Sequence, residues 1–187
     1  MRKKGIAMKR KFSWTLGQRS TSGSVAVEFA LIAPIFFLLL FAIIETTLAL
    51  FAGMTLENGM KTVARMIRTG QVQAQNMTQA QFRQQLCNQI NIVLSCDVQR
   101  LYIDVRAFGN FANSQFPAPI DANGNLNPNL NSYQVGNSSQ VGGNDIILVR
   151  ALYTWPMFTP LLGQYYANMQ NNTRLLTASA AFRNEPF

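Results

Sequence analysis

Histidine is absent from this 187-residue sequence, and acidic residues number only eight. Without histidine the chain lacks the commonest general base and a common metal ligand. The acidic residues share no spacing that would suit a catalytic pair, and the sequence has neither a phosphate-binding glycine loop nor a nucleophile elbow. Two cysteines alone complete no usual metal coordination shell. The sequence therefore predicts a protein that is not an enzyme and that needs no metal or cofactor.

Acidic residues are also missing from the first 23 residues, which contain seven basic ones: Arg2, Lys3, Lys4, Lys9, Arg10, Lys11 and Arg19. The rest of the chain is close to neutral, so the high isoelectric point is a property of this leader. A basic cluster ahead of the first apolar segment holds that end of the chain in the cytoplasm by the positive-inside rule. The alternative is a solvated or nucleic-acid-binding tail. We expect no nucleic-acid partner, because an apolar run follows the cluster.

Charged residues are next absent from Phe29 to Ile44, a run of sixteen residues, and the apolar character resumes from Leu48 to Met54. As a helix, Val25 to Met54 would cover roughly 43 Å, against a hydrocarbon core of about 30 Å. A secretory signal peptide is a poorer match, because its apolar region has about 7–15 residues and ends at a small-residue cleavage site. The run therefore predicts a retained transmembrane helix that sends the later residues across the membrane.

Gly23 precedes this run and is separated by four residues from Glu28-Phe29. The spacing resembles the cleavage signature of type IV prepilins, in which a membrane aspartic peptidase cuts after the glycine. A longer set of residues is similar to the TadE-like pseudopilins of tight-adherence (Flp, type IVc) pilus systems. This set comprises Val25–Pro34, Ile44-Glu45, Val63–Arg65 and Arg68–Gly70, with a weaker likeness in residues 181–187.

The resemblance implies that a prepilin peptidase cleaves between Gly23 and Ser24, and that Glu28 and Phe29 make the assembly contact. It implies a minor pilin or pseudopilin of a Flp pilus, which supports surface adhesion and biofilm formation. The partners would be the peptidase, the major and minor pilin subunits, the inner-membrane assembly platform of the Tad system, and membrane lipid. The chain would be a single-pass protein of the bacterial inner membrane with a periplasmic C-terminal domain, or would enter the extracellular pilus.

Glu28 also has a physical rationale at the start of the apolar run. Cleavage after Gly23 would create an ammonium group at Ser24, and a carboxylate about one helical turn away on a neighbouring subunit would neutralise it. Ions buried in apolar surroundings require such partners. The alternative places Glu28 at headgroup depth, facing water. Glu45 lies near the opposite interface, and we expect its carboxylate to reach water there.

Beyond the membrane, a helical pattern continues from Thr55 to Arg68 and is predicted to stop at Gly70. Residues 71–77 then read as a polar connector. A second helix is predicted from Thr78, which has capping-box spacing to Gln81. Its apolar residues recur at steps of four and predict a core face or, alternatively, a partner-binding face. They are Phe82, Leu86, Ile90 and Leu94.

Cys87 and Cys96 are the two cysteines of the chain. If the C-terminal part is periplasmic, they are expected to form a disulfide across the end of the second helix and the following turn. Closing a loop of ten residues stabilises a protein by about 2–3 kcal/mol in the chain-entropy model. The alternative is a pair of small buried side chains.

The remaining pattern indicates an antiparallel sheet. Residues 101–106 alternate as in a half-buried strand, residues 146–153 form a nearly continuous apolar run, and residues 177–183 suit a last strand. Between the first two, residues 109–144 form a long polar loop that is either a surface feature or locally disordered. The predicted fold class is α+β: a long, pilin-like N-terminal transmembrane helix, then a small domain with a short helix packed on an antiparallel sheet.

The sequence thus predicts three segments, 1–23 as a cleaved leader, 24–70 as the TadE-like helix, and 71–187 as the periplasmic domain. Two functions from different classes fit this organisation. The first is a minor pilin or pseudopilin processed after Gly23. The second is an uncleaved single-pass inner-membrane anchor whose periplasmic domain binds another protein. Processing and self-association distinguish them.

Overall fold

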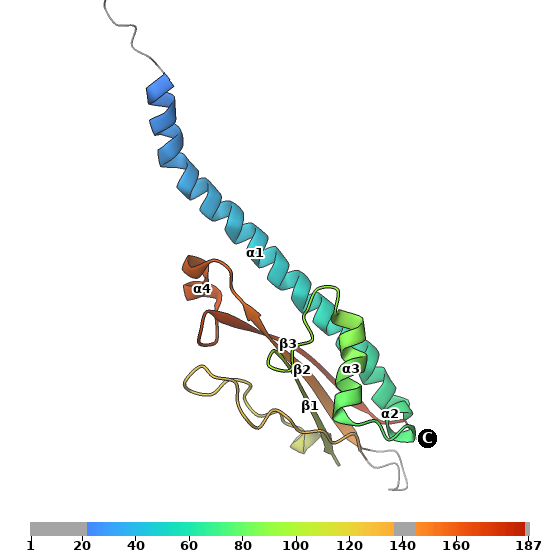
Figure 1. Ribbon diagram of the computed structural model, residues 1–187. Helices are drawn as coiled ribbons and strands as arrows, with labels where there is room; N and C mark the ends of the chain where they lie inside the picture. Colours follow the sequence, from blue (N-terminus) through green and yellow to red (C-terminus); the bar gives the residue numbers. More distant parts are fainter. Residues whose placement is uncertain (1–21, 137–144, 186–187) are drawn as a thin grey trace, which may run out of the picture. The chain divides into compact units, whose positions relative to one another are not determined.

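The computed structural model describes residues 22–136 and 145–185 of the chain. Most of the predicted leader lies outside these residues. The elements are α1 (Ser22–Arg68), α2 (Gln71–Ala74), α3 (Gln79–Ile90), β1 (Leu101–Phe108), the 3-10 turn η1 (Phe111–Asn113), β2 (Ile146–Pro156), α4 (Pro160–Tyr166) and β3 (Thr173–Arg183) (Figure 1). The α+β class predicted from the sequence is confirmed.

The described chain falls into two compact units that divide after Leu39. In the first unit, residues 22–39 are helical, and every side chain from Gly23 to Leu39 is exposed except that of Ala33, which is half-buried. Among the described residues, the helix Gly23–Arg68 is the one that is long and apolar enough to cross a membrane. An exposed apolar helix of this length is what the sequence predicted for the transmembrane segment.

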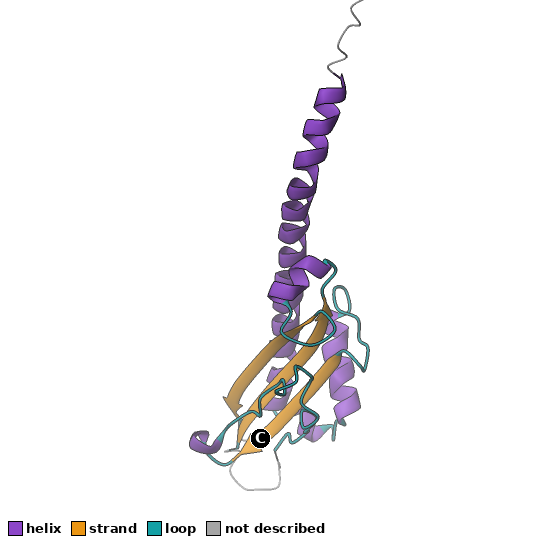
Figure 2. Cartoon of the chain, turned by 90° about the vertical axis from the view of Figure 1, so that its left-hand side faces the viewer, coloured by secondary structure: helices purple, strands orange, loops and turns teal. Residues whose placement is uncertain are grey.

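The second unit is built on a three-stranded antiparallel sheet in the order β1-β2-β3 (Figure 2). Val149 of the central strand lies opposite Val105 of β1 and Ala180 of β3. The central place of β2 explains its continuous apolar sequence, because a strand covered on both faces has no solvent-facing positions. The last strand begins at Thr173, four residues before the predicted start, because its pairing with β2 continues as far as Pro156.

Helices α1 and α3 cover one face of the sheet and enclose the main core. From α1 this core takes Ala52, Leu56, Met60, Val63, Ala64 and Ile67, all nearly or fully buried. Phe82, Leu86 and Ile90 of α3 are fully buried, as is Leu94, which lies beyond the end of the helix at Ile90; their assignment as core is confirmed. Thr78 and Gln81 form the predicted capping box. Helix α1 ends at Arg68, followed by Gly70 with a φ of 75°, a left-handed conformation that glycine adopts at low cost.

The sequence predicted a polar connector after Gly70, but the structure has the short helix α2 there. The C-terminal part of α1 also packs into the domain that follows it. Residues 40–68 of the helix belong to the second unit and supply part of its core, so the compact domain begins inside the helix. The predicted boundary between residues 70 and 71, which separates the TadE-like helix from the periplasmic domain, stays a prediction.

The long loop lies over the opposite face of the sheet as far as residue 136 (Figure 2). Leu130 packs on Leu152 and Leu175 in a second, smaller cluster. The Val105 N–H donates to the Ser132 carbonyl at 2.8 Å, and the Gln134 N–H donates to the Val105 carbonyl at 2.9 Å. The loop is therefore a packed surface feature over residues 109–136, while residues 137–144 lie outside the described chain.

Candidate functional site

The candidate processing site lies at the start of α1. Gly23 and Ser24 are helical and exposed, and the space around Gly23 is open, with nothing within 4 Å of the position a Cβ would take. The helix begins at Ser22, because no proline or turn interrupts the pattern that continues into the apolar run.

Glu28 lies one turn after Ser24 on the same face of the helix. The Ser24 hydroxyl donates to Oε1 of Glu28 at 3.3 Å. Both Glu28 and Phe29 are exposed. Glu28 is also the single charged residue between Ser22 and Ile44. The structure thus places the candidate assembly residues on a solvent-accessible apolar helix, with the carboxylate directed toward the predicted new N-terminus.

The prediction that the Glu45 carboxylate reaches water is wrong. Glu45 is only 4% exposed, and its carboxylate accepts the backbone N–H groups of Phe158 and Thr159, the latter at 3.2 and 3.3 Å. Thr159 is the N-cap of α4 but makes no side-chain capping bond, and Pro160 follows it. The carboxylate of Glu45 therefore supplies the acceptor that the start of α4 otherwise lacks.

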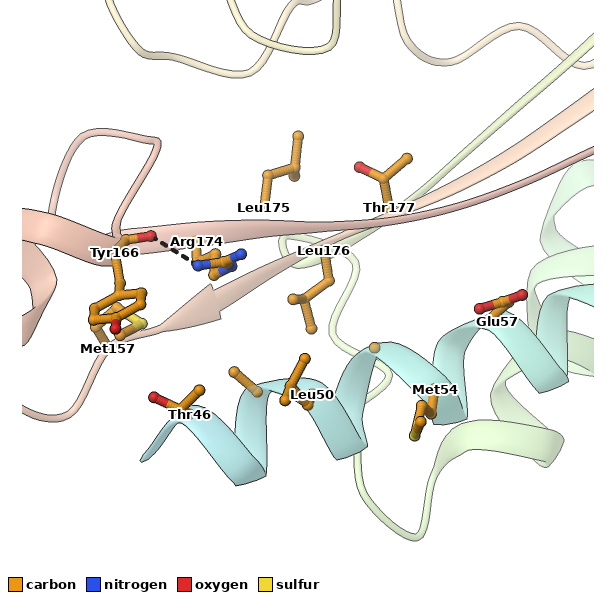
Figure 3. A pocket seen from close by; sticks show the side chains of 12 residues that line it. Thr46, Leu50, Met54, Glu57, Met157, Tyr166, Arg174, Leu175, Leu176 and Thr177 are labelled. Carbon is orange, nitrogen blue, oxygen red and sulfur yellow. Dashed lines mark hydrogen bonds between the residues drawn. The ribbon is translucent and has the colours of Figure 1, made fainter. Parts of the chain in front are cut away.

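An apolar groove of about 420 Å³ lies between α1 and β3, beside Tyr166 at the end of α4 (Figure 3). Leu50 and Met54 of α1 line it, and Leu176 of β3 points toward Leu50. At one end, Arg174 Nη1 donates to the carbonyl of Tyr166 at 3.3 Å. Its lining is mostly apolar, with Glu57 and Arg174 as its charged residues.

A buried ionic cluster lies on the loop side of the sheet. Asp104 is fully buried, and its carboxylate accepts Arg150 Nη2 at 3.2 Å and Arg106 Nε at 3.1 Å. Burial lowers the pKa of the Arg150 guanidinium, and the negative charge of Asp104 opposes that shift. Sequence reasoning left Asp104 among the scattered acids and did not single out Arg150, although it is the one charge within the apolar run of β2.

The same cluster fixes the long loop. Arg150 Nη1 donates to the Pro117 carbonyl at 3.0 Å, and its guanidinium lies over the ring of Phe116, 4.2 Å from the centroid. Arg106 Nη2 donates to the Asn129 carbonyl at 2.8 Å. Each guanidinium thus joins the buried carboxylate to a different part of the loop, which is a structural role. The described residues contain no cluster of metal-binding side chains.

Cys87 and Cys96 are joined by a disulfide, with Cα atoms 5.7 Å apart. Cys87 lies in the last turn of α3 with its side chain buried, and Cys96 lies in the segment that leads to β1. The bond thereby ties the end of α3 to the entrance of the sheet.

Comparison with known proteins gives a match at the N-terminal side. Residues 23–65 match the family model described as TadE-like protein. No curated protein and no solved structure matches the chain. The match begins at Gly23, covers Glu28 and Glu45, and ends near the last turn of α1. The recognition made from the sequence is therefore confirmed over this part of the chain.

Proposed function

We propose that this chain, which carries a TadE-like region at residues 23–65, is a minor pilin or pseudopilin of a Flp-type (Tad) pilus. A prepilin peptidase removes the basic leader after Gly23, the apolar part of α1 holds the processed protein in the inner membrane, and the compact domain lies in the periplasm. From there the subunit enters the pilus or its base and supports surface adhesion. The TadE-like family is not known to be catalytic.

The observation that carries the proposal is the position of Glu28. The family match begins at the glycine that precedes it, and the described residues up to Ile44 hold no other charge. A lone carboxylate on an exposed apolar helix is costly in lipid unless a cation pairs with it. Cleavage after Gly23 would supply such a cation, the Ser24 ammonium group of a neighbouring subunit.

The test is the N-terminal residue of the membrane-bound protein, from cells that contain a prepilin peptidase and from cells that lack one. We expect a chain that begins at Ser24 only where the peptidase is present. Gly23→Val should abolish this processing, and Gly53→Val, a matched change of a second glycine of α1 with open space around it, should not. A chain that begins at Met1 in both strains would overturn the proposal and favour the uncleaved anchor.

A further inference from the structure

The short helix α4 presents an apolar surface that nothing in the described chain covers. Phe158 is 66% exposed and Tyr165 81% exposed, and Leu161 and Tyr166 are exposed as well. We call these four residues the α4 surface. No charged residue occurs between Arg150 and Arg174. An uncharged, exposed surface that combines aliphatic and aromatic side chains is typical of a contact with another apolar phase.

The place of α4 along α1 is fixed by Glu45. The backbone at Phe158 and Thr159 donates to the Glu45 carboxylate, so the start of α4 lies at the level of that residue. Glu45 directly follows the sixteen uncharged residues Phe29–Ile44, which as helix amount to about 24 Å, most of the hydrocarbon thickness. If those residues span a bilayer, α4 lies at the depth where hydrocarbon meets headgroups.

The composition of the α4 surface suits that depth. Tyrosine is enriched at membrane interfaces because its ring is apolar and its hydroxyl polar. In the same unit, α1 also exposes apolar side chains close to Glu45 in the sequence, among them Phe41, Ile44 and Leu48. Arg174, whose guanidinium donates to the Tyr166 carbonyl, adds a cation next to it, as interfacial elements that meet anionic lipids commonly have.

We propose that the α4 surface is a second membrane contact: a monotopic element that rests on the lipid surface at the level of Glu45. This inference rests on the proposed membrane insertion of α1. The contact would restrict the tilt and rotation of the domain above the bilayer, because the domain would then meet the membrane at two places. It also gives Glu45 a role, which is to hold the interfacial helix at the correct depth while its own charge is shielded by backbone amides.

The opposite end of the unit provides an internal control. Phe111 is 62% exposed and lies beyond β1. At this end of the sheet, Phe108 of β1 pairs with Ile146 of β2, and Ile146 pairs with Arg183 of β3. At the same end, the Glu185 N–H donates to the Arg68 carbonyl at 3.1 Å. About 35 Å of helix α1 separates Arg68 from Glu45. An exposed aromatic residue at that end should remain in water.

The experiment places an environment-sensitive fluorophore at single positions of the full-length chain. The variants are Tyr165→Cys and Leu161→Cys on the α4 surface, Phe111→Cys as the water control and Phe36→Cys within the apolar run. Labelling without reductant keeps the Cys87–Cys96 bond and leaves one reactive thiol. Each protein is reconstituted into vesicles of phosphatidylethanolamine and phosphatidylglycerol, with and without lipids that carry a shallow or a deep nitroxide quencher.

We expect blue-shifted emission and loss of fluorescence with the shallow quencher at both α4 positions, no quenching at position 111, and strongest quenching by the deep quencher at position 36. If the probes at the α4 positions are not quenched while the probe at position 36 is, this inference is wrong and the membrane helix of the proposed function still stands. No quenching at position 36 would overturn the membrane helix of the proposed function. A blue shift at α4 that depends on the protein-to-lipid ratio and not on the quencher would assign the α4 surface to a second copy of the chain and overturn the lipid contact.

Discussion

At the scale of single residues, the carboxylate of Glu45 determines whether the start of α4 keeps its hydrogen bonds. Glu45→Ala would leave the N–H groups of Phe158 and Thr159 without their acceptor. Because an unsatisfied buried donor costs about 1–3 kcal/mol, we expect the free energy of unfolding in detergent micelles to fall by about that amount. Amide exchange at Phe158 and Thr159 should rise at the same time.

The matched control is Glu57→Ala on the same helix. Glu57 is exposed and pairs with Lys61 at 2.7 Å, four residues on. An exposed ion pair of this kind contributes about 0–1 kcal/mol. Equal losses of stability for the two variants would show that Glu45 has no special role at α4.

Tyr133 gives the protein a sensitivity to alkaline pH. Burial raises the pKa of its hydroxyl to about 12 from an ordinary value of 10.0, and the hydroxyl donates to the Met77 carbonyl at 3.1 Å. Because the folded state resists ionisation more than the unfolded state, its contribution to stability is complete below pH 10 and is lost as the pH rises toward 12. We expect the melting temperature to fall over that window, and to fall less in Tyr133→Phe. Tyr165→Phe, a change at an exposed tyrosine, should retain the wild-type pH profile.

At the scale of elements, the close approach of α1 and α3 depends on Gly59. A Cβ at this position would lie 2.6 Å from Ile90 Cγ2 and 3.2 Å from Leu86 Cδ1, so Gly59→Ala forces the two helices apart. Gly53 lies in the same helix with open space around it, and Gly53→Ala therefore reports the helix propensity of alanine alone. We expect Gly59→Ala to be less stable than Gly53→Ala by about 1–3 kcal/mol in denaturant unfolding. Equal stability would mean that the helices are free to shift.

The disulfide acts on the junction between α3 and the sheet. We expect alkylation to modify neither Cys87 nor Cys96 before reduction and both after it, as read by intact mass. The double variant Cys87→Ser/Cys96→Ser should lose about 2–3 kcal/mol of unfolding free energy, because the open chain gains the entropy of a ten-residue loop. Two thiols that react without reductant in the folded, membrane-bound protein would contradict the bond.

Elements with a strong local pattern could be predicted from the sequence, and contacts between distant residues could not. The steps of four in α3, its capping box and the apolar run of β2 are local signals, and the structure has each of them. The partner of Glu45 lies 113 residues away along the chain, and no periodicity near residue 45 points to it. For the same reason the sequence does not decide whether residues 109–136 are packed or disordered. Arg106 and Arg150 hold this loop by donating to distant carbonyls, and Asp104 accepts the Ser132 N–H.

At the scale of the whole molecule, one helix serves two environments. From Gly23 to Leu39 its side chains are exposed on nearly every face, whereas from Ala52 to Ile67 one face is buried in the core of the domain. A change in the first part can therefore alter contacts in the membrane or between subunits without a loss of domain stability. A change in the second part, such as at Gly59, alters the fold. The two kinds of defect are separable by experiment.

Glu28→Gln applies that separation to assembly. The substitution removes the charge and keeps the shape of a side chain that is exposed in the described chain, so unfolding free energy and membrane insertion should remain at wild-type values. If the Glu28 carboxylate neutralises the Ser24 ammonium of a neighbouring subunit, piliation and crosslinking between subunits should be lost, because the ammonium would remain unpaired in apolar surroundings. Glu57→Gln removes a water-exposed carboxylate of the same helix and should assemble normally. Normal piliation in Glu28→Gln would rule out the pairing mechanism even if the leader is cleaved after Gly23, since processing and charge pairing are separate steps.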